Sequence, residues 1–337
     1  MPYVDLSRDP AAMRRIFTGL GLAGADEPVA AAALAGGVSS GIYRIDLRSG
    51  SYCLKQALPR LKVAKEWNVP VERVFAEVAW LRTVAGIAPG HVPRVLGQDD
   101  ASKSFVMEFL GPQYRSWKAD LLAGQVGPAV AGAVGDVLGR VHAATADHAL
   151  LAERFATDAT FHAIRLEPYL LETARVHPGL APVLLATVER TAATRRVLVH
   201  GDISPKNILL GPHGPVLLDA ECAWFGDPAF DVAFCLNHFL LKAAHLPRHG
   251  QALMESYRAF LTGYFARVEW EAPQALEQRI AALLPALTLA RVDGKSPVDY
   301  LTDPQRQAVR RVAIALLRDP PAQLEQVAAS WAGEFIA

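Results

Sequence analysis

The chain has 337 residues, of which 51% are hydrophobic and 20% are charged, which is typical of a globular protein rather than a disordered one. Lys and Arg total 34, as do Asp and Glu, so no global charge favours nucleic acid or an acidic membrane. We find no signal peptide and no apolar run that would span a bilayer. The three cysteines form no C-x-x-C pair. We therefore expect a soluble cytoplasmic protein with no disulfide framework, zinc site, nucleic-acid partner or membrane partner.

The first third of the chain predicts a small antiparallel sheet with one helix. The helix follows Asn68, which can cap it, and Pro70, which suits its first turn; apolar residues then recur at helical spacing up to Gly86. The sheet is expected to begin at about Ala31, with a first strand that ends before the loop 36–41. Alternating apolar and polar residues and turn signals predict further strands at 41–47, 52–56, 92–99 and 104–110.

The rest of the chain predicts mostly helices. An amphipathic stripe between Val130 and Val141 indicates one of them, and a strand-rich island lies at 197–219. Beyond Ala229 the pattern is helical, with breaks near Pro247, near Pro273 and at 291–300. We therefore expect an α+β protein with a β-rich part, residues 1–110, and a larger helical part, residues 111–337.

The segment HGDISPKN (200–207) and the Asp in GPVLLDAE (214–221) form the strongest candidate site. NILL and PVLLD around GPHG predict a hairpin, which would bring the side chains of Asn207 and Asp219 together at its open end. Two oxygen ligands suit Mg²⁺, and Asp202 could accept a proton from an incoming hydroxyl. The alternative is that Asp202 only caps a turn and Asn207 only ends a strand. The spacing is that of the protein-kinase catalytic loop, which favours the functional interpretation.

A phosphoryl-transfer site also needs a cation on the nucleotide phosphates. Lys55 on a predicted strand suits this role, and Glu77 on the helix is its expected ion-pair partner, with Glu72 turned further toward solvent. The small residues of GGVSSG (36–41), among them Gly37, Ser39 and Ser40, could cover phosphates with their backbone amides, although this loop is also compatible with an ordinary hairpin.

HGDISPKN together with LLDAECAWFGDPAFDVA resembles the aminoglycoside phosphotransferase and choline kinase-like superfamily, small-molecule kinases with the protein-kinase fold. Five further segments resemble methylthioribose kinase: 55–67, 73–77, 92–95, 106–110 and DAE at 219–221. The resemblance implies a bilobal fold that binds ATP and Mg²⁺ between a small β-rich N-lobe and a large helical C-lobe.

The resemblance also implies roles for individual residues. Asp202 would be the catalytic base, and Asn207, Asp219 and Glu221 would be metal-side ligands. Lys55 would bind the phosphates with Glu77 as its partner. The segment MEFLG (107–111) falls where a hinge would offer backbone groups to an adenine ring, which makes Glu108 and Leu110 candidates for nucleotide binding.

The acceptor stays open among methylthioribose, choline, aminoglycosides and other small alcohols. Trp224 is a candidate substrate residue, either within an aromatic cage or as part of the core. Arg291 and Asp293 are candidates for reading the substrate, although a solvated loop explains them equally well.

The resemblance also implies that Asp231 braces the catalytic-loop backbone, a structural role that we prefer to a chemical one. His142 is expected to be a packed residue at a helix end, and His200 is expected to make an internal hydrogen bond. We therefore expect an ATP-dependent small-molecule O-phosphotransferase of undetermined oligomeric state. The competing hypothesis is a nucleotide-binding pseudokinase that regulates a partner.

Overall fold

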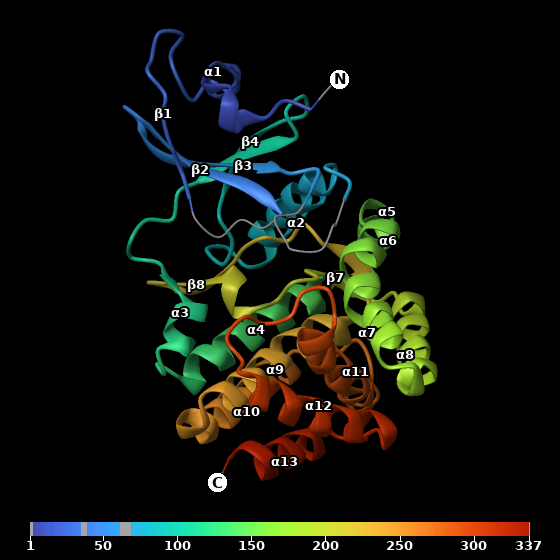
Figure 1. The fold of residues 1–337 in the computed structure, drawn as a ribbon. Helices are drawn as coiled ribbons and strands as arrows, with labels where there is room; N and C mark the ends of the chain where they lie inside the picture. Colours follow the sequence, from blue (N-terminus) through green and yellow to red (C-terminus); the bar gives the residue numbers. More distant parts are fainter. Residues whose placement is uncertain (1–2, 35–38, 61–68, 337) are drawn as a thin grey trace. The chain divides into compact units, whose positions relative to one another are not determined.

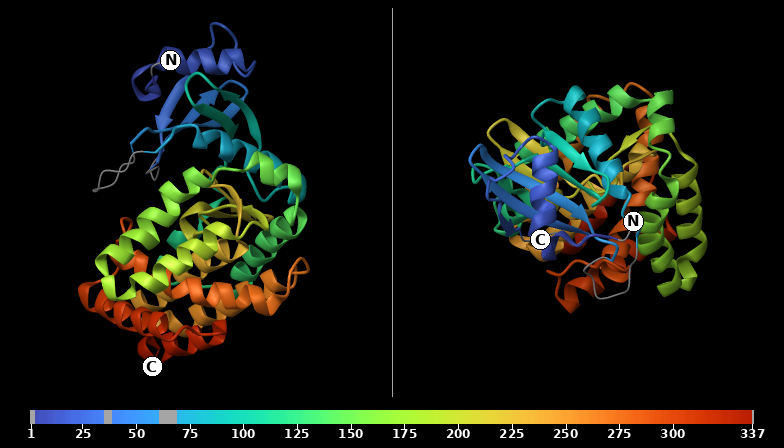
Figure 2. Two further views of the ribbon diagram at one scale, coloured as in Figure 1. Left: turned by 90° about the vertical axis from the view of Figure 1, so that its right-hand side faces the viewer. Right: turned by 90° about the horizontal axis from the view of Figure 1, so that it is seen from above.

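The structure is a computed structural model that describes residues 3–34, 39–60 and 69–336. The chain divides into two units, Met1–Gln113 and Tyr114–Ala337. Figure 1 labels their helices and strands, and Figure 2 gives two further views in the same colours. None of the described helices combines the length and the apolar character that a bilayer crossing requires.

The first unit is built on an antiparallel sheet of five strands in the order β1-β2-β3-β5-β4. Figure 1 labels β1, β2, β3 and β4 of this sheet. The strands are β1 (Ala30–Ala33), β2 (Ser40–Leu47), β3 (Gly50–Ala57), β4 (Val95–Asp99) and β5 (Ser104–Glu108). The predicted strands are confirmed: β1 is the strand expected from about Ala31, and β4 and β5 are shorter than expected. In the central strand β3, Lys55 pairs with Ile42 on one side and with Phe105 on the other.

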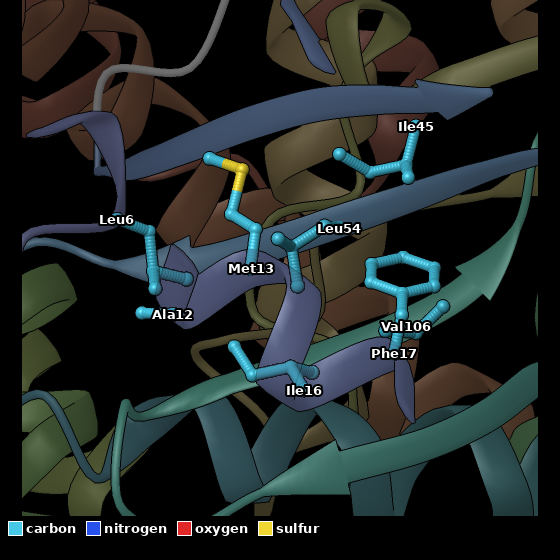
Figure 3. Packing of buried hydrophobic residues seen from close by; sticks show 8 residues of the cluster. All are labelled: Leu6, Ala12, Met13, Ile16, Phe17, Ile45, Leu54 and Val106. Carbon is cyan, nitrogen blue, oxygen red and sulfur yellow. The ribbon is translucent and has the colours of Figure 1, made fainter. Parts of the chain in front are cut away.

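Helices cover both faces of this sheet. They are the short η1 (Leu6–Arg8), α1 (Pro10–Gly19) and α2 (Arg73–Ile87). Successive side chains of a strand point to opposite faces, so Leu54 and Lys55 face different helices. Leu54 packs against α1, whereas Lys55 meets Glu77 of α2. Figure 3 shows the α1 side of the core, which comprises Leu6, Ala12, Met13, Ile16, Phe17, Ile45, Leu54 and Val106.

The predicted start of the helix in this unit was wrong. Asn68 lies outside the described residues, and Pro70 precedes the helix, which begins at Arg73 without a side-chain cap on Glu72. The Arg73 guanidinium donates to the backbone oxygen of Pro70 at 2.8 Å and to that of Ser39 at 2.6 Å. These bonds fix the segment before α2 as a turn, so the first helical turn comes later than the proline suggested.

The second unit opens with a short strand and a series of helices. They are β6 (Arg115–Ser116), α3 (Trp117–Leu122), α4 (Pro128–Thr145), α5 (Ala149–Arg154), α6 (Asp158–Phe161), the π-helix η2 (His162–Leu171), α7 (Glu172–Val176), η3 (Pro178–Leu180) and α8 (Ala181–Ala193). The amphipathic helix predicted around Val130–Val141 is confirmed as α4. A proline, Pro168, lies inside η2; it has no backbone N–H to donate, which disfavours a regular α-helical turn there.

The β island of this unit carries the strongest sequence signal. Its elements are β7 (Val197–Val199), η4 (Pro205–Asn207), β8 (Ile208–Gly211), β9 (Gly214–Leu217) and β10 (Trp224–Gly226). β8 and β9 form the predicted hairpin, with β6 as a third strand, and β7 pairs with β10.

The remaining helices surround one central helix, α9. They are α9 (Pro228–His245), η5 (Pro247–His249), α10 (Gly250–Phe265), α11 (Pro273–Asp293), α12 (Asp303–Arg318) and α13 (Leu324–Phe335). α9 is buried along nearly its whole length and contacts α10, α11, α12 and α13. The break expected at 291–300 lies at 294–302, because α11 continues to Asp293 and α12 begins at Asp303. A helix that is buried all round is normally apolar, so the polar residues that α9 carries call for an explanation.

Candidate active site

Asp202 lies in the turn between β7 and η4, with 7% of its surface exposed. Its Oδ2 is 2.9 Å from Nη2 of Arg165 and 3.6 Å from Nζ of Lys206. Its backbone N–H donates to Nδ1 of His200 at 3.1 Å, and its backbone oxygen accepts from Nδ2 of Asn207 at 3.1 Å. The carboxylate is therefore oriented by two cations, while its backbone is tied to its own loop.

Asp231 at the start of α9 braces this loop, as the family resemblance implied. Its Oδ2 accepts from the backbone N–H of His200 at 2.7 Å, and its Oδ1 accepts from that of Gly201 at 2.8 Å. Gly201 has φ +80°, and a Cβ there would lie 2.7 Å from the Cβ of Cys222, so the turn requires glycine. The buried carboxylate of Asp231 accepts hydrogen bonds from the two backbone amides that precede Asp202, and it thereby fixes the position of Asp202.

The two histidines of this region are structural, as expected. Burial lowers the pKa of His200, and its Nε2 lies 3.0 Å from the backbone oxygen of Leu218. The fully buried ring of His142 bridges the Tyr264 hydroxyl at 2.9 Å and Oδ2 of Asp231 at 3.3 Å. Both rings thus support the loop and its brace.

The hairpin links Asn207 to the chain just before Asp219. The backbone N–H of Leu218 donates to the backbone oxygen of Asn207 at 2.9 Å, which extends the β8–β9 pairing by one step. Asp219 has φ +68°, a left-handed conformation that an L-residue adopts at a cost of about 1–3 kcal/mol. Strained residues cluster at functional sites, although aspartate also adopts this conformation in ordinary turns. Glu221 follows two residues later and is 8% exposed.

These residues fit a magnesium site by their chemistry. Asn207 uses its amide nitrogen on Asp202, which leaves the amide oxygen as its ligand atom. Asp219 and Glu221 would offer carboxylate oxygens, and hard oxygen ligands are those that Mg²⁺ takes. Within residues 3–34, 39–60 and 69–336, no group of three or more His, Cys, Asp or Glu side chains is arranged to hold a metal ion. The predicted set is of another kind, two carboxylates and an amide.

In the first unit, Lys55 and Glu77 form a buried ion pair. Nζ of Lys55 lies 2.7 Å from both carboxylate oxygens of Glu77, and the side chains are 3% and 2% exposed. The competitor Glu72 is 62% exposed and lies 3.6 Å from Lys103. The prediction that Glu77, and not Glu72, pairs with Lys55 is therefore confirmed.

The predicted phosphate-covering loop is described only in part, because Gly37 lies outside the described residues. Ser39 and Ser40 are buried, and the backbone oxygen of Ser39 accepts from Arg73 and from the backbone N–H of Leu58. The end of this loop is thus fixed to α2.

The two hinge candidates differ in how they are held. Glu108 ends β5, and its Oε1 accepts from the backbone N–H of Arg94 at 2.8 Å, so its side chain fixes the start of β4. Leu110 follows β5 and is half-buried. Their assignment to nucleotide binding stays a prediction.

The candidate substrate residues of the second unit have partners within the protein. Trp224 is 1% exposed, stacks on Phe161 with 4.3 Å between ring centroids, and donates to Asp158. Arg291 donates to Ser296 and lies 3.3 Å from the Tyr169 hydroxyl. These contacts agree with the core alternative for Trp224, and they place Arg291 in the last turn of α11 rather than in a loop.

Asp293 is engaged more completely than Arg291. Both of its oxygens are 2.9 Å from Nε of Arg310, and Oδ2 is 2.7 Å from Nε2 of His177. These two partners outweigh burial and hold the pKa of this carboxyl below its ordinary value. Asp293 therefore joins α11 to α12, and its role toward a substrate stays a prediction.

The sequence pattern of the phosphotransferase enzyme family matches residues 30–276 of the chain. This segment is well over half of the chain and includes every candidate catalytic residue described above. The chain belongs to this family.

Similar sequences within the family include two methylthioribose kinases. Methylthioribose kinase 1 of Oryza sativa subsp. japonica is 24% identical over 243 residues, covering 63% of this chain and 55% of the relative. The methylthioribose kinase of Exiguobacterium sibiricum is 29% identical over 258 residues, covering 69% and 66%. The chain thus spans between about half and two thirds of the length of these curated relatives.

Solved structures of small-molecule kinases share the fold of this family member. Amicoumacin kinase hAmiN, in complex with AMP-PNP, Ca²⁺ and Ami, aligns with a TM-score of 0.57 at 16% identity, covering 94% of this chain and 98% of that one. An ethanolamine kinase from Plasmodium vivax aligns with a TM-score of 0.54 at 12% identity, covering 96% and 86%. The expected kinase-like α+β fold is therefore confirmed.

Arg165 is the residue of this site that sequence reasoning missed. It lies on η2, 35 residues or more from the catalytic-loop segment, and contacts both the Asp202 carboxylate and the backbone oxygen of Gly201. No motif around Arg165 indicates this contact. Lys206 carried a weak signal, because it stands four residues after Asp202 in the quoted loop.

Proposed function

We propose that this chain transfers the γ-phosphoryl group of ATP to a hydroxyl group of a small molecule. The observation that supports this most strongly is the joint fixation of Asp202 and Asn207. The Asn207 amide bonds the Asp202 backbone while Asp231 holds the two preceding amides. A loop held this rigidly suits a reaction whose catalysis depends on positioning and on charge stabilisation.

In this proposal Asp202 is the base that orients the incoming hydroxyl and accepts its proton. Arg165 and Lys206 both contact Oδ2. We therefore assign Oδ1 to the acceptor hydroxyl. A carboxylate whose other oxygen is clamped by a guanidinium presents Oδ1 in one orientation, which favours an in-line attack on the phosphorus.

We assign the metal-binding role to Asn207, Asp219 and Glu221, and the phosphate-binding role to Lys55 held by Glu77. Bound Mg²⁺ would neutralise charge on the nucleotide phosphates. Lys55 would add a positive charge that the buried Glu77 keeps in one place. The family membership and the fold shared with a kinase bound to AMP-PNP support ATP as the nucleotide.

Two further assignments belong to this proposal. The partners are a nucleotide and a small-molecule alcohol, and methylthioribose is a candidate because the similar sequences carry that name. The three cysteines are free and buried, which agrees with a reducing cytoplasmic location.

The test is ADP release from MgATP with a panel of acceptors, run for the wild type and for Asp202→Asn. Loss of a general base lowers turnover by about 10²–10⁴-fold, while nucleotide binding should persist because Asp202 does not hold the nucleotide in this scheme. The panel comprises methylthioribose, other sugars, glycerate, homoserine, choline, ethanolamine and several aminoglycosides.

Asp319→Asn serves as the matched control, because this aspartate is exposed at the end of α12. It should keep wild-type turnover. An Asp202→Asn protein with undiminished turnover would overturn the assignment of the base. Nucleotide binding without turnover on any acceptor would favour the pseudokinase instead.

A further inference from the structure

The buried helix α9 and the segment after α11 bring four polar side chains into one group, His238, Lys242, Arg291 and Tyr300, which we call the α9 cluster. His238 and Lys242 lie one turn apart on α9 and are only 7% and 1% exposed. Nζ of Lys242 is 5.3 Å from the ring centroid of Tyr300. Arg291 is close enough to Lys242 that its positive charge helps to lower the pKa of the Lys242 amine.

The two cations of the α9 cluster have no carboxylate counter-ion among the described residues. Arg291 bonds only uncharged groups there, on Ser296 and Tyr169. The acidic groups that act on Lys242 are the Cys235 thiol and, more weakly, the Asp299 carboxylate, which is 81% exposed and 4.0 Å from Lys118. In the part of the chain that the structure describes, the cluster therefore carries uncompensated positive charge.

Neighbouring charges are compensated, which makes the α9 cluster unusual for its surroundings. Asp293 meets Arg310 and His177, and Lys295 lies 2.8 Å from Glu167. Only two to four residues separate these groups from Arg291. The lack of a counter-ion is therefore specific to the α9 cluster and is not shared by the charged residues next to Arg291 in sequence.

The α9 cluster also has polar atoms without hydrogen-bond partners. Within the described residues, Nδ1 of His238, Nε of Arg291 and the Tyr300 hydroxyl are buried and lack a partner. Each such atom costs about 1–3 kcal/mol when left unpaired. Nε of Arg291 and the Tyr300 hydroxyl can both donate, and together with the Lys242 ammonium they form a set of donors suited to an oxyanion.

A short series of contacts connects the α9 cluster to the proposed base. The Arg165 guanidinium that pairs with Asp202 lies 5.7 Å from the ring centroid of Tyr169 and 5.6 Å from that of Phe234. The Tyr169 ring in turn faces Arg291 at 5.8 Å, and the Phe234 ring packs edge-to-face on His238 at 5.7 Å. The rings of Tyr169 and Phe234 therefore contact Arg165 on one side and members of the cluster on the other.

We propose that the α9 cluster binds an anionic oxygen group of the acceptor, so that the substrate is an alcohol bearing a carboxylate or a phosphate. This inference rests on the proposed phosphotransferase function and names the substrate class of the same site. Buried cations whose charge a ligand completes are a common device of binding sites. The same charges disfavour cationic acceptors such as choline, ethanolamine and aminoglycosides.

The protonation of Lys242 supports this assignment. Burial, helped by Lys118 and Arg291, lowers the pKa of Lys242 to about 7. An anion beside the amine would stabilise the ammonium form. At a pH at which the amine of the unliganded protein is neutral, Lys242 therefore takes up a proton when the anion binds. The affinity for an anionic acceptor should therefore fall as the pH rises above 7, by up to tenfold per pH unit. The charged and titratable groups around the amine are Lys118, Cys235, His238, Arg291, Asp299 and Tyr300.

The decisive variant is Lys242→Met, which removes the charge and keeps an unbranched side chain that can stay buried. For anionic acceptors we expect KM to rise at least tenfold, with a smaller change in kcat and an unchanged KM for ATP. Lys242→Arg should retain part of the affinity. Lys295→Met is the matched control, because this lysine is already paired with Glu167, and it should leave KM unchanged.

The acceptor panel separates the possible classes of substrate. Glycerate, gluconate and homoserine carry a carboxylate; glycerol 3-phosphate and ribose 5-phosphate carry a phosphate; ribose and methylthioribose are neutral; choline and kanamycin are cationic. Preference for either anionic class supports the inference and tells the two anions apart. Equal or better kcat/KM with neutral or cationic acceptors, or an unchanged KM in Lys242→Met, would overturn it.

A binding measurement separates this inference from the proposed function. In Asp202→Asn, whose turnover should be strongly reduced, titration with gluconate and with inorganic phosphate should still raise the melting temperature, and Lys242→Met should abolish that rise. If Asp202→Asn keeps full turnover, the assigned base is wrong while the anion site stands. If the anions stabilise Asp202→Asn and Asp202→Asn/Lys242→Met equally, the anion site is wrong while the phosphotransferase stands.

Discussion

Burying a lysine on the central strand of a sheet is unfavourable unless a carboxylate pairs with its ammonium group. In this chain Glu77 is the partner of Lys55. Glu77 offers both of its oxygens at 2.7 Å, although the two residues are separated by 21 others in sequence. Strand β3 turns Lys55 toward α2, and α2 carries Glu77 on the face that reaches the sheet. The pair is thus a consequence of strand alternation and of the rotation of one helix.

We predict that Glu77→Gln lowers the free energy of unfolding of the first unit by about 3–5 kcal/mol, because it takes a carboxylate from a buried ammonium. Chemical denaturation followed by fluorescence would measure the change. The double variant Lys55→Met/Glu77→Leu should regain most of the stability but not the activity.

Glu72→Gln is the control for this prediction, since that side chain is 62% exposed, and it should change stability by less than about 0.5 kcal/mol. Equal stability of Glu77→Gln and the wild type would show that the buried pair does not stabilise this unit.

Asp202 was predicted from the sequence, whereas its contact with Arg165 was not. The sequence identified Asp202 from its spacing to Asn207 and Asp219, which is local information. Arg165 reaches the same carboxylate from another helix, and only the packing of η2 against the loop brings the two together. A contact between distant segments carries no signal in a single sequence.

At the scale of elements, the close approach of α4 and α10 depends on glycine. A Cβ on Gly263 of α10 would lie 2.2 Å from the backbone oxygen of Gly132 on α4, and one on Gly135 would lie 2.1 Å from that of Phe260. Backbone atoms cannot rotate away as a side chain can. The two helices are therefore in backbone contact, which larger residues would prevent.

We predict that Gly263→Ala destabilises the second unit by about 1–3 kcal/mol, because the added methyl group forces the two helices apart. A thermal melt of the purified protein would register this as a lower Tm.

Gly333→Ala on α13 provides the matched comparison, since no atom lies within 4 Å of its would-be Cβ. The same substitution there should stabilise the helix by up to about 1 kcal/mol, because alanine has the higher helix propensity. Similar effects at the two positions would contradict the role of backbone contact.

At the scale of the whole molecule, the proposed function links ligand binding to folding stability. A ligand that binds only the folded chain stabilises it by about 2.7 kcal/mol at a hundredfold excess over Kd. The metal contribution to this stabilisation should depend on Asp219, the residue that the structure holds in a left-handed conformation.

We predict that MgATP raises the Tm of the wild type more than ATP with EDTA does, and that Asp219→Asn removes most of this difference. Differential scanning fluorimetry at matched ATP concentrations would measure it. Asp147→Asn is the control, because Asp147 also has a positive φ, of 52°, and is assigned no ligand. A magnesium effect that survives Asp219→Asn would exclude this carboxylate as the metal ligand.

Local pattern was enough to determine much of this protein. The β2–β3 and β8–β9 hairpins follow from alternation and turn residues, and the spacing of Asp202, Asn207 and Asp219 identified the candidate site and the family resemblance. Where local signals competed, as with Pro70 and Arg73, the boundary of the helix was misplaced. These features are readable because neighbouring residues specify them.

Only the tertiary structure decided which distant groups share an environment. The Arg165 contact with Asp202, the paired state of Asp293 and the uncompensated charge of the α9 cluster all depend on contacts between elements that are far apart in sequence. The physical reason is that burial and electrostatic interaction act through space, so a residue's charge acquires a role only when the fold determines what surrounds it.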